Sequence, residues 1–325
     1  AIGTNALIDN TTGGYCTAVG YTAGNSNTTG EYNTSLGYRA LGANTTAHNN
    51  TAIGSDALLT NTTGASNVAV GAYALNLNAT TSDNVAIGRS ALMNNVASNN
   101  TAIGKQALTA NTTAPGNTAV GYQSLKTNTT GEVNTAVGEY ALRDNTTGTN
   151  NLAFGSNGLL LNTTGWGHAA FGVAVLDANT TGVKNISIGG YSLSANTTGA
   201  ENTAVGYNAL LANTTGGYNT AVGYRAGDGI SSGSYNTVVG NDTLLGTCTG
   251  TYNTAVGYGV LQVVTSGTSN TGVGDRAGFA LTSGDNNLLL GNDAGRTGSP
   301  GGNVVTGNNE MALGDENIAS ASIQV

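Results

Sequence analysis

A repeat of about 17 residues runs through this chain and constrains its fold more than any other feature. Its clearest copy, residues 202–218, reads Asn-Thr-Ala-Val-Gly-Tyr-Asn-Ala-Leu-Leu-Ala-Asn-Thr-Thr-Gly-Gly-Tyr. The glycine that ends the short apolar run returns nineteen times between Gly3 and Gly307, and only two of the steps are 16 residues long. A fixed short period over a whole chain is typical of solenoids and fibres, in which each repeat packs on its neighbours.

The first half of the repeat predicts a short β-strand. With the leading Asn as position 0, position 3 is Val, Ile, Leu or Phe in eighteen of nineteen copies, and position 2 is usually Ala. Side chains alternate between the two faces of a strand, so one face carries large residues and the other small ones. We expect the large residues to face the core, joined by the Leu at position 8 from a second short strand at positions 7 and 8. The residues predicted for the core are Val19, Ile53, Val120, Phe154, Phe171, Val205 and Leu210.

The second half of the repeat predicts turns. Asn-Thr-Thr-Gly at positions 11 to 14 is turn chemistry, because Asn and Gly tolerate left-handed backbone and Thr hydroxyls bond to nearby amides. The many Gly, Thr and Asn residues leave no window for a helix. Stacked coils also bring the position 0 side chains together, and stacked Asn amides bond along the axis. The residues predicted for this ladder are Asn33, Asn50, Asn67, Asn84, Asn117, Asn134, Asn202 and Asn219.

These features predict an all-β fold, a parallel β-roll or β-helix solenoid of about 17-residue coils. The array spans residues 1–314 in about 19 coils and starts in the middle of a repeat, and residues 315–325 form a different, strand-like tail. Each coil has few large side chains to bury, so we expect three chains to pack side by side along the row of Ala at position 2. The alternative is that the small Ala side chains only make the coil of a monomeric solenoid narrower and play no part in packing between chains.

The composition excludes several classes of partner. The net charge is −8, and the nine Lys and Arg residues are scattered singly, so no basic stripe exists to follow the phosphates of a nucleic acid. No apolar run approaches the roughly 18 residues that a membrane-spanning helix needs. Cys16 and Cys248 lie about fourteen repeats apart, which is too far for a disulfide within one solenoid, so both thiols are expected to be free.

The sequence contains no arrangement typical of catalysis. His48 and His168 are the only histidines and lie seven repeats apart, so neither a Ser-His-Asp arrangement nor a histidine metal site is supported. We therefore expect a protein that is not an enzyme, with no catalytic residue, no metal site and no cofactor.

Two further motifs could carry function. Asn-Thr-Thr matches the acceptor pattern for N-glycosylation, although turn and ladder chemistry explains the motif equally well. The candidate acceptors are Asn111, Asn128 and Asn145. Trp166, the single Trp, lies in a predicted turn between glycines, where it would either stack on a sugar or pack on a neighbouring chain.

The motif Asn-Thr-Ala-(Val/Ile)-Gly with a following Ala resembles the coil motif in the head domains of trimeric autotransporter adhesins. Those heads are trimeric, left-handed parallel β-rolls. The 17-residue form with Tyr-x-Ala-Leu and Asn-Thr-Thr-Gly is still more similar to repeats of bacteriophage tail fibres and related bacterial surface proteins. Residues 312–325 resemble the junction before the endosialidase-type intramolecular chaperone that follows such arrays. The resemblance implies a homotrimer outside the cell, on a virion or a cell surface.

We therefore expect a structural fibre shaft with an adhesive or receptor-binding role, whose partners are further copies of itself and a cell-surface glycan or receptor. The alternative is a monomeric ice-binding or lattice-binding solenoid, in which rows of Thr at position 1 and in the Thr-Thr pairs order water. Those rows are irregular, because position 1 also takes Val, Leu, Ile and Ala. Thermal hysteresis would distinguish the two functions.

Overall fold

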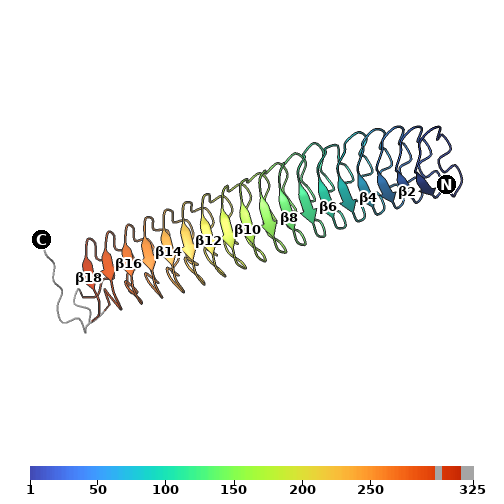
Figure 1. The fold of residues 1–325 in the computed structure, drawn as a ribbon. Helices are drawn as coiled ribbons and strands as arrows, with labels where there is room; N and C mark the ends of the chain where they lie inside the picture. Colours follow the sequence, from blue (N-terminus) through green and yellow to red (C-terminus); the bar gives the residue numbers. More distant parts are fainter. Residues whose placement is uncertain (297–301, 316–325) are drawn as a thin grey trace. The chain divides into compact units, whose positions relative to one another are not determined.

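A computed structural model describes residues 1–296 and 302–315 of the chain. They fall into two compact units, residues 1–166 and 167–325, which we describe one at a time. Figure 1 shows the strands and the coils that connect them. Each unit is an all-β, parallel solenoid of coils about 17 residues long, and no helix occurs in the described residues. The predicted fold class is confirmed at this level. The single array predicted over residues 1–314 stays a prediction.

Unit 1 contains nine strands of three residues, each from a different coil. They are β1 (Thr17–Val19), β2 (Thr34–Leu36), β3 (Thr51–Ile53), β4 (Val68–Val70), β5 (Val85–Ile87), β6 (Thr101–Ile103), β7 (Thr118–Val120), β8 (Thr135–Val137) and β9 (Leu152–Phe154). Neighbouring strands pair in parallel with equivalent residues opposite each other, as in Ala52↔Ala69. Each repeat position therefore forms a column that crosses the strands of the unit.

The described residues of unit 2 repeat this arrangement with nine more strands. They are β10 (Ala169–Phe171), β11 (Ile186–Ile188), β12 (Thr203–Val205), β13 (Thr220–Val222), β14 (Thr237–Val239), β15 (Thr254–Val256), β16 (Thr271–Val273), β17 (Leu288–Leu290) and β18 (Met311–Leu313). Pairing is again parallel and in register, as in Ala204↔Ala221.

Left-handed backbone bends the chain back on itself in every coil. In the coil of residues 33–49, Gly37, Arg39, Leu41 and Asn49 have φ angles of 137°, 54°, 53° and 60°. These residues occupy positions 4, 6, 8 and 16, and most other coils show the same pattern. The second strand predicted at positions 7 and 8 is therefore wrong. A left-handed Leu costs about 1–2 kcal/mol, and it persists because its side chain is fully buried in the coil.

The strands face the opposite way to the prediction. Position 2 points inward, where Ala18, Ala119 and Ala204 are at most 1% exposed, and position 3 points outward. The core prediction is thus wrong for six residues. Of these, Val19, Ile53, Val120 and Val205 are only half-buried, and Phe154 and Phe171 are exposed. Leu210 is buried as predicted.

The narrow interior explains this reversal. In most coils the Leu at position 8 fills the space between the strand and the opposite turn, and position 2 is Ala, Ser or Gly; the buried exceptions are Val238 and Leu289. At Gly272, which occupies position 2 in β16, an added Cβ would already lie 2.6 Å from Val260 Cγ1. The core of most coils therefore consists of small residues at positions 2 and 7 around a buried Leu at position 8, which is replaced by glycine at Gly24, Gly227, Gly278 and Gly295.

The last coil is longer than the repeat predicts. β17 pairs directly with β18, with Leu288 opposite Met311, so this coil contains 23 residues. The motif copy that ends at Gly307 forms no strand, and its Val304 is buried instead. The tail predicted for residues 315–325 lies, except for Asp315, outside the described residues.

The glycine at position 4 generates our first prediction. Gly121 has a φ of 137°, and a Cβ there would lie 2.3 Å from Gly138 O in the next coil. Gly121→Ala should therefore lower the free energy of unfolding by more than about 2 kcal/mol, measured by urea denaturation. Gly14→Ala is the control, because a Cβ at Gly14 meets no atom within 4 Å. Equal stability of the two variants would contradict this account.

Candidate functional site

The outward face of each unit's strands carries an apolar column at position 3 beside a column at position 1 that is Thr in eleven of the eighteen described strands. Positions 1 and 3 of every strand point away from the core, and neighbouring strands place these residues in columns. The position 3 column of unit 1 is Val19, Leu36, Ile53, Val70, Ile87, Ile103, Val120, Val137 and Phe154. That of unit 2 is Phe171, Ile188, Val205, Val222, Val239, Val256, Val273, Leu290 and Leu313. We call positions 1 and 3 of the strands of each unit its outer stripe.

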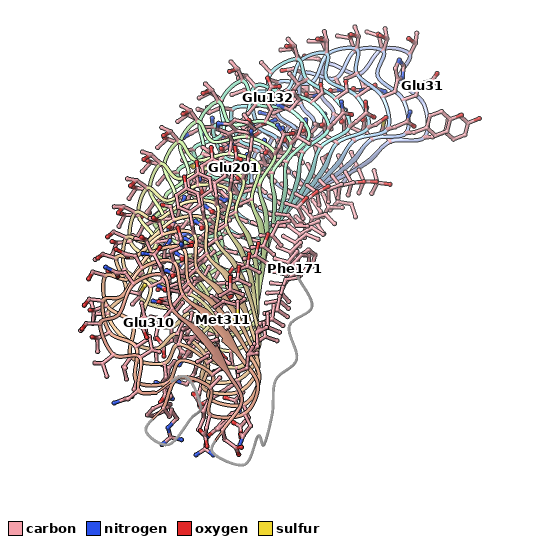
Figure 2. All side chains as sticks on the ribbon, turned by 90° about the vertical axis from the view of Figure 1, so that its left-hand side faces the viewer. Glu31, Glu132, Phe171, Glu201, Glu310 and Met311 are labelled. Carbon is pink, nitrogen blue, oxygen red and sulfur yellow. The ribbon has the colours of Figure 1, made fainter. Side chains whose placement is uncertain are left out.

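No other segment of the described residues covers the outer stripe, so its side chains are exposed to solvent. Leu36 is 44% exposed and Ile188 is 42% exposed, although residues of the same column cover one another at the strand spacing of about 4.8 Å. No charged residue occupies position 1 or 3 in any described strand. Figure 2 shows carbon-only side chains, Phe171 among them, along one side of unit 2, and Glu201 and Glu310 away from them.

The Asn residues at position 0 form the first of two buried ladders. Asn33 Oδ1 accepts a hydrogen bond from the backbone N of Asn50 at 2.9 Å, and Asn50 Nδ2 donates to Gly64 O at 2.9 Å. All eight asparagines predicted for this ladder are at most 4% exposed. The bonds between coils run mainly from amide to backbone, whereas the sequence suggested bonds from amide to amide.

A second ladder, of direct amide pairs, lies at position 11. Asn44 Nδ2 donates to Asn27 Oδ1 at 2.7 Å and to Ala47 O at 3.1 Å, and Asn61 Nδ2 donates to Asn44 Oδ1 at 3.0 Å. Sequence reasoning missed this ladder because Asn-Thr-Thr-Gly is typical of an exposed turn. The available signal was that position 11 is Asn in every copy from Asn10 to Asn213, whereas a surface turn would vary among Asn, Asp, Ser and Gly.

This second ladder excludes the predicted glycosylation in the folded protein. Asn111, Asn128 and Asn145 are all fully buried. Asn128 Nδ2, the atom that would carry the sugar, donates to Asn111 Oδ1 at 3.3 Å and to Gly131 O at 2.9 Å. A glycan on that nitrogen would remove a donor and would have no space between the coils.

The two Thr residues that follow this Asn differ in role. The first, at position 12, bonds to the next coil, as when Thr28 Oγ1 donates to Thr45 O at 3.0 Å. The second, at position 13, is exposed, as at Thr29 and Thr130. The Thr-Thr pairs therefore present one exposed column of Thr side chains instead of two.

The amide ladder of unit 2 ends at Asn213. Its Oδ1 is buried and accepts no hydrogen bond from any described residue, because the next coil has Ile230 where an Asn would donate. Ile230 fills space that Gly227 leaves at position 8, where a Cβ would lie 3.1 Å from Ile230 Cδ1. Leu and Asn at positions 8 and 11 are thus replaced together by Gly and a large apolar residue. The same exchange pairs Gly278 with Leu281.

His168 occupies a position 0 slot in unit 2. It is 2% exposed, its Nε2 lies 2.8 Å from Gly182 O, and its Nδ1 accepts from the backbone N of Asn185 at 3.2 Å. Burial lowers the pKa of His168 to about 4. His48 belongs to unit 1, is exposed, and accepts at Nδ1 from the backbone N of Glu31.

The remaining candidates have ordinary surroundings. Cys16 and Cys248 are free thiols, and burial raises the pKa of Cys248 to about 11. Trp166, at the end of unit 1, is 43% exposed. In the described part of the chain, no three His, Cys, Asp or Glu side chains gather in a way that could hold a metal ion. No helix of those residues is long and apolar enough to span a membrane.

No protein-family model matches this sequence, and no curated protein does.

The second ladder gives a prediction for stability. Asn128→Ala leaves Asn111 Oδ1 without its donor and Asn145 Nδ2 without its acceptor, so it should cost about 2–4 kcal/mol in urea denaturation. Thr130→Ala, two residues away and exposed, is the matched control and should cost less than about 0.5 kcal/mol. If both variants unfold at the same urea concentration, position 11 contributes no ladder.

His168 gives a prediction for pH dependence. Its folded pKa of about 4 is lower than the ordinary value near 6.5, so the unfolded chain binds the proton more tightly. The stability is complete above about pH 6.5 and falls as the pH drops toward 4, with a loss of about 2 kcal/mol between pH 7 and pH 5.

His168→Asn should remove this part of the pH dependence, because Asn fills position 0 in the neighbouring coil at Asn185. The measurement is the urea midpoint at pH 5 and pH 7 for wild type, His168→Asn and the exposed-site control His48→Asn. A His168→Asn variant with the full wild-type loss at pH 5 would contradict the assignment.

Proposed function

We propose that this protein is a non-enzymatic structural shaft of a fibre, outside the cell on a virion or a cell surface, which assembles from three parallel copies and takes part in adhesion. The outer stripe carries this proposal. Soluble monomers rarely expose a large continuous apolar patch, and such patches usually mark an interaction surface.

The stripe suits a second copy of the same chain. Its columns repeat at the strand spacing, so a parallel copy in the same register meets it level by level with the same residues. The strands are three residues long, so each stripe is only two side chains wide. Three such narrow stripes around a common axis would cover one another completely. We therefore propose a seam between chains at positions 1 and 3. The Ala row at position 2, which the sequence suggested as the seam, is buried inside each coil.

The ladders suit a shaft. In each unit, backbone pairs and the position 0 amides link neighbouring coils, and the position 11 amides add links throughout unit 1 and as far as Asn213 in unit 2. Such one-dimensional arrays derive their stability from the interfaces between neighbouring repeats. The recurring links between coils can therefore stabilise an elongated array that has no large globular core.

One observation also favours ice or lattice binding as a second candidate. In unit 2, five successive strands, β12 to β16, present Thr at position 1 and Val at position 3 of the outer stripe. A flat, regular face of Thr and Val could order water if it remained exposed. The same surface cannot serve both roles, because self-association would cover it.

Light scattering on the purified chain tests the proposal. We expect a native mass near three times the 32.1 kDa of one chain. The double variant Ile103→Glu and Val120→Glu places two charges in the outer stripe and should yield monomers with an unchanged circular dichroism spectrum. The control, Thr113→Glu and Thr130→Glu, adds the same charge at two exposed positions outside the stripe and should remain trimeric.

A wild-type monomer would overturn the assembly. Thermal hysteresis in that monomer, removed by Ile103→Glu and Val120→Glu but not by the control, would establish the lattice-binding function instead.

A further inference from the structure

A notch on the surface of unit 1 combines an open cavity with a guanidinium group whose terminal nitrogens are not engaged. The notch has a volume of about 440 Å³ and is open to solvent. Its lining residues are Thr22, Asn25, Ser26, Arg39, Gly42, Ala43, Leu59 and Thr60. These come from positions 6, 9 and 10 of three successive coils, away from the outer stripe.

Gly42 creates the notch. It occupies position 9, where the neighbouring coils have Asn25 and Leu59, so a column of side chains is interrupted for one level. The backbone of Gly42 has no left-handed φ, and a Cβ there would meet Leu59 Cδ1 at 3.1 Å. Since the adjacent coils accept larger residues at this position, the backbone geometry does not demand glycine at position 9. The absence of a side chain at Gly42 leaves the space that forms the notch.

Arg39 has contacts that orient its side chain, but its two terminal nitrogens remain available for hydrogen bonds. Its Nε lies 3.5 Å from Asp56 Oδ1, and its guanidinium carbon lies 5.8 Å from the centre of the Tyr38 ring. Within residues 1–296 and 302–315 its terminal nitrogens make no hydrogen bond, and its side chain is 46% exposed. Asp56 is buried behind it, so Arg39 is the charged group that lines the notch.

The other arginines at position 6 show the contrast. Arg225 Nε lies 2.9 Å from Asp228 Oδ2, and its Nη1 lies 3.2 Å from Asp242 Oδ1. Arg276 is likewise placed between Asp275 and Asp293. Each of these two contacts a pair of carboxylates, whereas Arg39 has a single long contact and faces open space.

The other walls of the notch combine polar and apolar side chains. Asn25, oriented so that its nitrogen donates to Gly42 O at 2.8 Å and Thr22 O at 3.2 Å, fixes one wall. Ser26 and Thr22 add hydroxyl groups, and Leu59 and Ala43 add an apolar surface. A guanidinium with free terminal donors matches a carboxylate in a two-point contact, and the hydroxyl and apolar walls match a sugar ring.

We propose that this notch binds a saccharide that carries a carboxylate, with the carboxylate on the terminal nitrogens of Arg39 and the ring against Leu59. The inference rests on the adhesive part of the proposed function and is independent of self-association. Asp9 lies one coil beyond Ser26 and next to Asn25, since its backbone N donates to Asn25 O at 3.0 Å, and its side chain is exposed. The negative charge of its carboxylate beside the notch opposes the binding of an anion. Binding should therefore be weak and salt-dependent, with millimolar affinity for a monosaccharide.

Saturation-transfer NMR on the full chain with glucuronate as the probe tests this site. We expect a signal from glucuronate, a signal at least tenfold weaker from glucose, and none from acetate or inorganic phosphate at the same concentration. Arg39→Gln should abolish the glucuronate signal, and Gly42→Leu should abolish it by filling the notch without removing the charge. Arg225→Gln, at the same repeat position but without a notch, should leave it unchanged, and Asp9→Asn should strengthen it about twofold to threefold.

Each other outcome overturns a defined part of the proposal. Equal signals from glucose show that the carboxylate is not recognised, and equal signals from acetate or phosphate show that the site takes any anion. No signal from glucuronate at 20 mM, or a signal that survives both Arg39→Gln and Gly42→Leu, removes the site. The mass from light scattering is a separate readout, so a chain that binds glucuronate as a monomer would keep the site and lose the trimeric shaft.

Discussion

Within each unit every coil lies on the next in parallel and in register, so the nearest neighbour of a side chain is the residue at the same position one repeat away. This constraint selects the residue types. An Asn can donate to its own kind and accept from it, and Tyr rings can stack, as Tyr218, Tyr235 and Tyr252 do at 4.8 and 4.9 Å. A charge repeated in consecutive coils would repel itself, and position 6 instead alternates sign between Arg225 and Asp242. The outer stripe follows the same rule, because uncharged side chains can repeat at positions 1 and 3 in consecutive coils without repelling one another.

The amide ladders hold the coils together where a hydrophobic core would be too small. Each amide in the middle of a ladder is satisfied by its neighbours, and only a ladder end leaves an unpaired atom, as at Asn213 Oδ1. Beyond that point, apolar residues such as Ile230 and Leu281 take over the column, and glycine at position 8 makes room for them. In two coils the exchange is made at both positions, Gly227 with Ile230 and Gly278 with Leu281, whereas Gly24 is combined with Asn27 and Leu261 with Val264.

The sequence predicted the period, the parallel solenoid and the burial of Asn at position 0, because these follow from repetition alone. It did not predict which strand face is buried, since that depends on the left-handed backbone of residues such as Leu58 (φ 52°), a conformation that propensity rules assign to Gly or Asn. Once Leu58 fills the coil, Ala52 must face inward and Ile53 outward. The Arg39 notch was equally hidden, because one Gly42 among 51 glycines carries no signal until the neighbouring coils are placed beside it.

The buried ladders also bear on how the protein ages. Asparagine side chains are thermolabile, and a chain with so many of them would ordinarily accumulate chemical damage over time. Deamidation needs the side-chain carbonyl carbon to move against the following backbone nitrogen, and an amide such as that of Asn61 is held at both its oxygen and its nitrogen by neighbours above, below and within its own turn. The same contacts that join the coils therefore restrict this reaction at the buried asparagines of the ladder.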